Sequence, residues 1–144
     1  MDIKEAPRNI LVRMNALLRQ LSEKAQKISK EDLKKILMQE MLLAHAFKGN
    51  LFIGMASIHF RQTLIRKVGI IEDVVTDKNY RGKGIGRKLT EMLIEEAKKR
   101  RAEYIELTSN PKRKAAIALY KKLGFKLIAK AVGKNGTNLY RLYL

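Results

Sequence analysis

The sequence predicts one α/β domain over residues 1–144, with helices flanking a mixed β-sheet. Its 144 residues are the length of a single domain, and 46% of them are apolar, which is enough for a continuous core. The spacing of the apolar residues changes along the chain from helical to alternating and back to helical. No repeat, long linker or low-complexity segment interrupts this pattern, so a second domain is not expected.

The first part of the chain is predicted to form a short strand over residues 2–6 and then two helices. Pro7 suits the start of a helix, and apolar residues follow at helical spacing over residues 8–22. Ser29 precedes two acidic residues and is the expected N-cap of the second helix, which the apolar spacing extends to Met41.

The centre of the chain is predicted to form three antiparallel strands, because it is rich in apolar and β-branched residues. The strands cover residues 42–47, 50–60 and 66–76, with turn residues at 49–50 and 62–63 between them.

The last part of the chain returns to alternating helices and strands. A helix is predicted from Ile85 to the basic run at 98–101, because positive charge is favourable at a helix C-terminus. A strand over 104–108 and a helix over 113–123, closed by Gly124, follow. Asn135-Gly136 predicts a hairpin between residues 125–132 and 137–144. The predicted order is therefore β-α-α-β-β-β-α-β-α-β-β.

The amino-acid composition excludes several kinds of catalytic and metal-binding site. The absence of cysteine excludes disulfides, thiolate nucleophiles and Cys-ligated metals, and with only His45 and His59 no metal site is expected. Both histidines fall on predicted strands and are interpreted as packed or surface residues. No apolar run is long enough to span a membrane and no signal peptide begins the chain, so we expect no membrane association and a cytoplasmic location. The net charge of +17 favours an anionic ligand.

A glycine-rich turn between a strand and a helix, at residues 82–86, is the most informative motif. Backbone N–H groups of such a turn can point into one concavity, and the following helix adds N–H groups without intrahelical partners. Glycine lets a phosphate approach the backbone closely and permits positive φ. The turn therefore predicts a pyrophosphate site. Its G-x-G-x-G spacing matches neither the P-loop nor the dinucleotide fingerprint, which disfavours ATP, GTP and dinucleotides.

Two segments carry a family resemblance. Arg81–Gly86 fits the [QR]-x-x-G-x-[GA] signature of the GNAT superfamily of N-acetyltransferases, and Ala115–Phe125 resembles its A-x-x-L-Y-x-x-x-G-F segment. The predicted element order is also that of the superfamily. The resemblance is sharp over residues 70–125 and loose elsewhere. It implies the GNAT-like acyl-CoA N-acyltransferase fold, in which two parallel strands, here 70–76 and 104–109, splay apart around an acetyl thioester.

The resemblance implies an N-acetyltransferase that moves an acetyl group from acetyl-CoA to a primary amine, by direct attack in a ternary complex. The pantetheine arm would pair with the first splayed strand, and the pyrophosphate would lie on the glycine turn. The coenzyme-binding residues implied in this way are Val74, Val75, Thr76, Arg81, Gly82, Lys83, Gly84, Ile85, Gly86 and Arg87. The acceptor is left open between a small amine, an aminosugar and a peptide or protein amine.

The resemblance also implies the catalytic residues. Tyr120 stands where the superfamily often places a tyrosine general acid, and a phenol can protonate a departing thiolate. Glu72 is the candidate base for the amine, directly or through water, unless it only pairs with a neighbouring lysine. Strand alternation places Glu72 and Asp73 on opposite faces. Many members carry an asparagine seven residues before the tyrosine. Here that residue is Arg113, so either Arg113 or Asn110 is expected to contact the pantetheine.

Two other functions stay open. Residues 81–144 hold 17 basic and 5 acidic residues, a net charge of +12, which suits a protein that docks on RNA or the ribosome. No RNA-binding motif and no row of aromatic residues accompanies that charge. The other is a CoA-binding regulator without turnover. Assembly into a homodimer is also left open.

Overall fold

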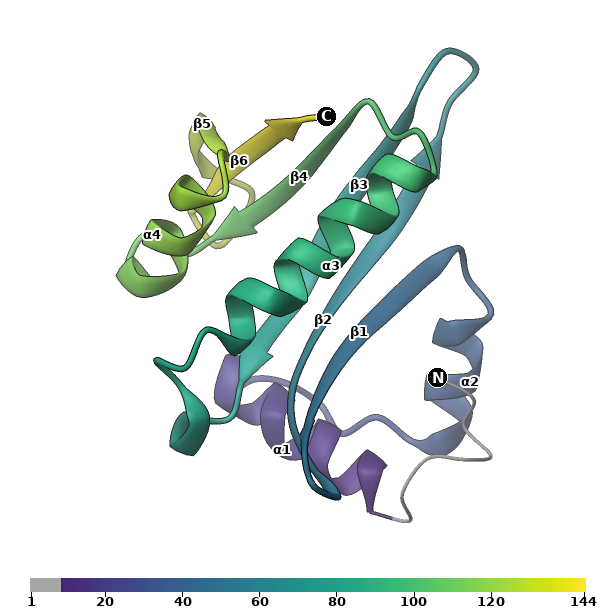
Figure 1. Cartoon of the computed structure of the whole chain (residues 1–144), viewed down its shortest axis with the longest axis vertical. Coiled ribbons are helices and arrows are strands. Elements are labelled where there is room, and N and C mark those ends of the chain that lie inside the picture. Colours follow the sequence, from purple (N-terminus) through teal and green to yellow (C-terminus); the bar gives the residue numbers. More distant parts are fainter. Residues whose placement is uncertain (1–8) are drawn as a thin grey trace.

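A six-stranded mixed sheet forms the centre of the structure, a computed structural model that describes residues 9–144 (Figure 1). The strands are β1 (Met41–Lys48), β2 (Leu51–Gln62), β3 (Lys67–Thr76), β4 (Tyr104–Ser109), β5 (Lys126–Val132) and β6 (Thr137–Tyr143). The helices are α1 (Ile10–Leu21), α2 (Lys30–Leu37), α3 (Ile85–Lys99) and α4 (Lys114–Lys122), with a 3₁₀ turn, η1, at Lys78–Tyr80. The predicted α/β class and mixed sheet are confirmed. The predicted strand at 2–6 and the helix start at Pro7 lie outside the described residues.

The second helix begins as predicted but ends earlier. The Ser29 side chain accepts the backbone N–H of Asp32, and the Asp32 side chain accepts that of Ser29, a complete capping box. The helix stops at Leu37, and Met41, the predicted last residue, instead begins β1 opposite His59. The apolar residues that suggested a longer helix instead pair with β2. Pairing and burial in the sheet favour the strand more strongly than the local apolar spacing favours the helix.

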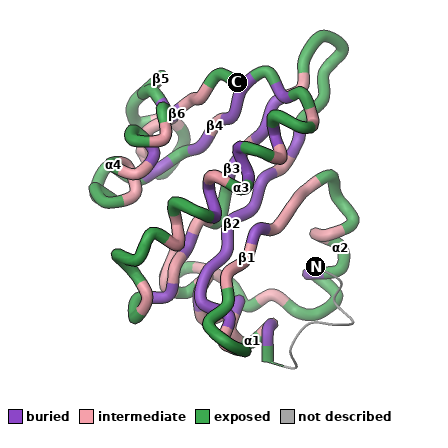
Figure 2. Tube along the Cα trace, viewed as in Figure 1, coloured by how far each residue is buried: buried purple, intermediate pink, exposed green. Residues whose placement is uncertain are grey.

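Helices cover both faces of the sheet and define two apolar clusters. The larger cluster joins α3, through residues such as Leu89 and Leu93, to Ile58 and Ile105 of the sheet. The smaller cluster joins α1, through Met14 and Leu17, to the other face of β2 and β3. Figure 2 shows the central strands buried along most of their length. The glycine-rich turn therefore follows a strand that is packed on both faces.

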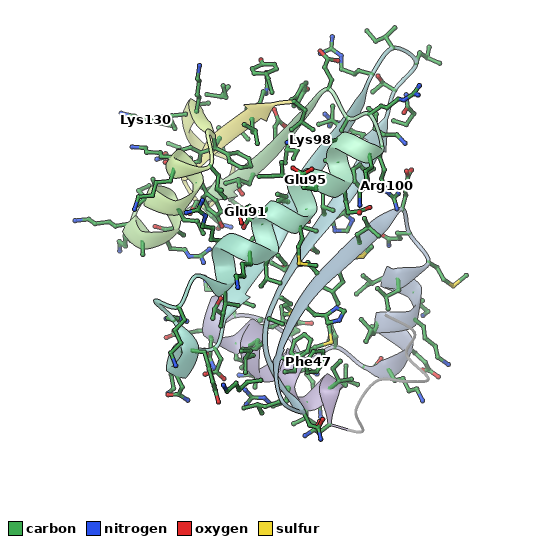
Figure 3. All side chains as sticks on the ribbon, in the orientation of Figure 1. Phe47, Glu91, Glu95, Lys98, Arg100 and Lys130 are labelled. Atoms are coloured by element: carbon green, nitrogen blue, oxygen red, sulfur yellow. The ribbon has the colours of Figure 1, made fainter. Side chains whose placement is uncertain are left out.

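The outer face of α3 is polar and carries short-range ion pairs. Glu95 and Lys98 lie along this face in Figure 3 and are joined by a contact of 2.9 Å between Oε1 and Nζ. Arg87 pairs with Glu91 one turn apart at 2.8 Å. Pairs of this kind on exposed helices contribute only a few tenths of a kcal/mol each. The position of α3 is therefore set by its buried face. Within residues 9–144, every helix is too short or too polar to cross a bilayer.

A β-bulge bends β3 at its centre. Met55 of β2 stands opposite Val75, but Ser57 stands opposite Glu72, so two residues of β3 face one residue of β2. Asp73 within this bulge has a φ of 53°, in the left-handed region. A bulge of this kind re-aims the strand that contains it. The carboxyl-terminal half of β3 therefore departs from the direction of its first half.

The parallel pair β3–β4 separates immediately before the bulge. Its pairing runs from Val68 opposite Tyr104 to Ile71 opposite Leu107 and stops there. Beyond that point β3 stays paired with β2, and β4 stays paired with β6. The two carboxyl ends are well apart in Figure 1. The splayed parallel strands expected from the family resemblance are thus present.

A partly buried ion pair holds α1 against the turn that follows β3. Arg13 Nη2 donates to Asp77 Oδ2 at 2.7 Å and to the Phe52 carbonyl at 3.2 Å. Asp77 is 3% exposed and also accepts the Asn79 backbone N–H at 2.9 Å. The Asn79 hydrogen bond, with help from Arg13, holds the pKa of the Asp77 carboxyl below its ordinary value against the opposing effect of burial. The ionised carboxylate is therefore part of the native fold.

We predict that Asp77→Asn lowers the free energy of unfolding at pH 7 by about 2 kcal/mol, because a buried charged acceptor is lost. The pKa of a carboxyl in the unfolded chain is near 3.9, and the pKa of Asp77 in the folded protein is lower. Such a carboxyl stabilises the fold at pH values above its unfolded pKa. This stabilisation is lost as the pH falls through its folded pKa. The difference between wild type and variant should therefore shrink on acidification below about pH 4. Urea unfolding at pH 7 and pH 3 measures it. The exposed Glu23→Gln is the control for charge, and an equal deficit at both pH values would contradict the prediction.

Candidate active site

Two adjoining cavities lie where β3 and β4 separate. The larger has a volume of about 750 Å³ and is bounded by the end of β3, the glycine turn, the start of α4 and the last turn of α1. Among the residues predicted for the coenzyme, those that line it are Val74, Val75, Thr76, Arg81, Gly82, Gly84, Ile85, Gly86, Arg87 and Arg113. A volume of this size is typical of a site for a small molecule or cofactor.

The glycine turn presents free backbone donors to this larger cavity. Gly82 and Gly84 have φ values of 76° and 75°, a conformation that glycine adopts without strain. Gly84 is the N-cap of α3, and the first intrahelical bond is the one from Lys88 N–H to the Gly84 carbonyl. The N–H groups of the preceding three residues therefore have no intrahelical acceptor, and the first turn holds no acidic side chain. This end of α3 is suited to an anion.

Two arginines bond to backbone carbonyls of β3 on the side that β4 has left. Arg81 Nε donates to the Thr76 carbonyl at 3.1 Å, and Arg113 Nη2 donates to the Val74 carbonyl at 3.4 Å. Both bonds are made by exposed side chains. The edge of β3 between Val74 and Thr76 is thus available to an extended ligand that can replace these contacts.

The smaller cavity has a volume of about 290 Å³ and holds two carboxylates, those of Glu72 and Asp73. The prediction that they point to opposite faces is wrong. Asp73 Oδ2 accepts the Ser57 hydroxyl at 3.2 Å, and Glu72 Oε2 lies 3.5 Å from His59 Nε2. Ser57 and His59 are two residues apart on β2 and so share a face. The bulge at Asp73 breaks the alternation, and brings both carboxylates to one cavity. The partner of Glu72 is thus a histidine rather than the lysine considered from the sequence.

Tyr120 lies at the junction of the two cavities and lines both. It is 3% exposed, and its ring packs edge-on against Phe125 with 6.0 Å between centroids. Burial raises the pKa of the Tyr120 phenol above its ordinary value, while the positive charge of Arg113 acts in the opposite direction. The phenol is therefore protonated at neutral pH and can donate a proton.

The remaining predicted residues differ in position. Asn110 lines the smaller cavity, where its Oδ1 accepts the Lys112 backbone N–H at 2.9 Å, whereas Arg113 lines both cavities. Lys83 lines neither cavity, and its Nζ lies 5.4 Å from the centroid of the Tyr80 ring. The glycine turn therefore faces the cavity through its backbone and through Arg81 and Arg87 rather than through Lys83.

Sequence reasoning missed two polar residues of the smaller cavity. Strand alternation predicts that only one of Glu72 and Asp73 faces the cleft and leaves open which, and no sequence signal marks the bulge that brings both there. Ser109, the last residue of β4, is 3% exposed, and among the described residues its hydroxyl has no hydrogen-bond partner. A buried hydroxyl without a partner is costly unless a ligand or water satisfies it. Its place at the end of a splayed strand was the available signal.

Comparison with known proteins agrees with this geometry. The chain is 43% identical over 60 residues to an uncharacterized N-acetyltransferase of Methanocaldococcus jannaschii, a match covering 42% of this chain and 26% of that protein. It is 36% identical over 77 residues to the glucosamine 6-phosphate N-acetyltransferase of Trypanosoma brucei brucei, covering 51% of this chain and 50% of that protein. The chain thus matches half or less of the length of these curated relatives.

A likeness of fold extends over nearly the whole chain. An aminoglycoside 6'-N-acetyltransferase complexed with coenzyme A superposes with a TM-score of 0.78 at 17% identity, covering 99% of this chain and 94% of that one. The sequence model of the acetyltransferase (GNAT) family matches residues 12–125, which include the bulged strand, the glycine turn and the helix of Tyr120. On this match, the chain belongs to the acetyltransferase (GNAT) family.

Proposed function

We propose that this protein is an acetyl-CoA-dependent N-acetyltransferase that moves an acetyl group to a primary amine within a ternary complex. The observation that carries the proposal is the gap between β3 and β4. It opens on one side to the glycine turn and on the other to a cavity with two carboxylates, with Tyr120 between them. Each substrate therefore has its own side of the gap and meets the other at the phenol.

The glycine turn fits the pyrophosphate of the coenzyme. A Cβ atom at Gly82 or Gly84 would meet nothing within 4 Å, so the space above the turn is open. The free N–H groups at the start of α3 and the side chains of Arg81 and Arg87 supply the positive potential that two phosphates require. A phosphate-bearing ligand is thus matched by backbone donors as well as by side-chain charge.

The edge of β3 fits the pantetheine arm. Its amide groups would pair with Val74 and Thr76 in the manner of an added strand, in place of the two arginine contacts. Val75 is the sequence-based candidate for the donor to the thioester oxygen, on which negative charge develops during attack. Because Val75 is paired with Met55 of β2, the backbone N–H groups that face the open edge are those of Val74 and Thr76, and one of these is the expected donor. The coenzyme supplies the activated acetyl group, and the strand edge positions it.

The smaller cavity fits a cationic amine. A primary amine arrives protonated at neutral pH and must lose a proton before it attacks. Glu72 is the proposed proton acceptor, directly or through water, and Asp73 adds a second negative charge beside it. The free amine then forms the C–N bond as the C–S bond breaks, and the electron pair of that bond stays on sulfur. Tyr120 donates its phenolic proton to the sulfur. The nitrogen, positively charged once the bond has formed, releases its second proton, which returns to the phenolate through solvent in the open cavity, and Glu72 releases the first proton to solvent.

The class of acceptor draws support from the comparisons. One curated relative, 36% identical over 77 residues, is a glucosamine 6-phosphate N-acetyltransferase, whose acceptor is an amino sugar. Amino sugars are therefore the first acceptors to screen, before small amines and peptide amines. The interpretation as an RNA- or ribosome-docking protein is not favoured, since family membership accounts for the anion site at the glycine turn.

The decisive experiment combines calorimetry and a thiol-release screen. Acetyl-CoA and CoA should bind with measurable heat and stabilise the protein against thermal unfolding. A panel of aminosugars, aminoglycosides, polyamines and peptides should then contain an amine that releases free thiol. Binding without release for any amine would favour the regulator without turnover, and the absence of binding would overturn the proposal.

We predict that Gly84→Ala weakens coenzyme binding by about tenfold, because alanine at this positive φ costs roughly 1–2 kcal/mol and shifts the turn. Gly49→Ala is the matched control. Gly49 also has a positive φ, 56°, with open space around its Cβ position, but lies in the turn between β1 and β2. Calorimetry should show weaker CoA binding for Gly84→Ala alone. Equal affinities in the two variants would contradict the role of the turn.

We predict that Tyr120→Phe lowers kcat by about 100-fold while the affinity for acetyl-CoA stays within about threefold, because general acid catalysis contributes on this scale. The matched control is Tyr140→Phe, which removes the hydroxyl of another buried tyrosine that lines neither cavity. Steady-state kinetics and calorimetry separate the two effects. An unchanged kcat in a folded Tyr120→Phe variant would remove the assigned acid.

We predict that Glu72→Gln and Asp73→Asn have different kinetic signatures. If Glu72 accepts the proton, Glu72→Gln lowers kcat by about 100-fold at neutral pH. The kcat of this variant should rise again with pH, because more of the amine is then already unprotonated. Asp73→Asn should mainly raise the KM for the amine, because it removes attraction without removing the base. Profiles of kcat and KM against pH distinguish them, and the reverse pattern would assign the base to Asp73.

A further inference from the structure

The two cavities share a small set of residues. Leu21, Val74, Arg113 and Tyr120 line both. Two of these four carry polar side chains, the guanidinium of Arg113 and the phenol of Tyr120. If the coenzyme lies in the larger cavity and the amine enters the smaller one, the bond that breaks must lie at this junction. A positive charge therefore stands beside the reacting atoms together with the proton donor.

The present contact of Arg113 is one that a bound coenzyme would replace. Its Nη2 reaches the Val74 carbonyl at 3.4 Å, at the long end of hydrogen-bond distances. That carbonyl is the acceptor that the pantetheine arm would use. The backbone of Arg113 stays fixed, because its N–H donates to the Asn110 carbonyl at 2.9 Å and its carbonyl accepts the Ile117 N–H at 3.0 Å. The displaced guanidinium thus stays within reach of the junction, which Arg113 already lines.

Among the described residues Arg113 makes no direct ion pair, although it lines the same small cavity as Glu72 and Asp73. Across residues 9–144, no carboxylate lies within ion-pair distance of it, whereas Arg87 pairs with Glu91 and Arg141 with Glu106. It also acts on Tyr120, whose phenol pKa it lowers against the larger raising effect of burial. An unpaired guanidinium at the point where negative charge appears can stabilise that charge.

We propose that Arg113 stabilises the negative charge on the coenzyme sulfur as the acetyl group leaves, beside the hydroxyl of Tyr120. This inference rests on the proposed function. As the C–N bond forms and the C–S bond breaks, the electron pair remains on sulfur, and the guanidinium faces it while the phenolic proton is transferred. Arg113 is thereby a catalytic residue for the leaving group, and its positive charge takes the position where other members of the superfamily often carry a neutral asparagine.

The experiment measures the protonation of the CoA thiol when CoA is bound. The ultraviolet absorbance of the thiolate is followed from pH 6 to pH 10, with desulfo-CoA as the reference ligand that lacks sulfur. Wild type should lower the pKa of the bound thiol by about one unit relative to free CoA, which is a tenfold change in thiolate at fixed pH. Arg113→Gln should abolish this shift, and Arg113→Lys should retain part of it.

The matched control is Lys122→Gln, which removes one positive charge from an exposed residue of α4 that lines neither cavity. It should keep the shift of the thiol pKa. A shift that persists in Arg113→Gln, or that disappears equally in Lys122→Gln, would overturn the inference. An equal loss of affinity for CoA and desulfo-CoA in Arg113→Gln would also overturn it, because Arg113 would then contact a part of the coenzyme other than the sulfur. Failure of wild type to bind CoA would instead overturn the proposed function itself.

Discussion

The site depends on the loss of pairing between β3 and β4 after Ile71 and Leu107. A parallel pair that continued to Thr76 would leave no gap for a ligand and would satisfy the strand edge internally. The bulge at Asp73 prevents this by turning the second half of β3 toward β2, where its hydrogen bonds continue. One irregular residue therefore frees backbone groups for a ligand without leaving the strand unsupported.

The glycine turn relies on support from outside its own segment. Its backbone donors face the cavity only while the preceding 3₁₀ turn is held, and that turn is fastened by the contact of Asp77 with Arg13 and by the bond from Lys78 N–H to Gln20 Oε1 at 2.8 Å. Both partners belong to α1. The conformational freedom that glycine brings to the turn is thus limited by a partly buried charge pair, which keeps the donors organised for an anion.

Most of the fold followed from residue patterns, because apolar spacing, the Ser29 capping box and the glycine turns act locally. What could not be predicted depends on contacts between distant segments. The early end of α2 follows from pairing of Met41 with β2, and the shared face of Glu72 and Asp73 follows from a bulge that no local signal marks. The junction role of Arg113 and the unpartnered hydroxyl of Ser109 emerge only when β4 and α4 are placed beside β3.

The larger cavity is built almost entirely from one continuous stretch, residues 74–120, and α1 adds only Gln20 and Leu21. The smaller cavity takes only Leu21 from α1 and none of its lining from α2. The larger part of what α1 does for the site is therefore indirect, since Arg13 and Gln20 brace the turn that precedes the glycine-rich segment. A substitution of Arg13, which lines neither cavity, should thus alter the geometry of that segment from a distance.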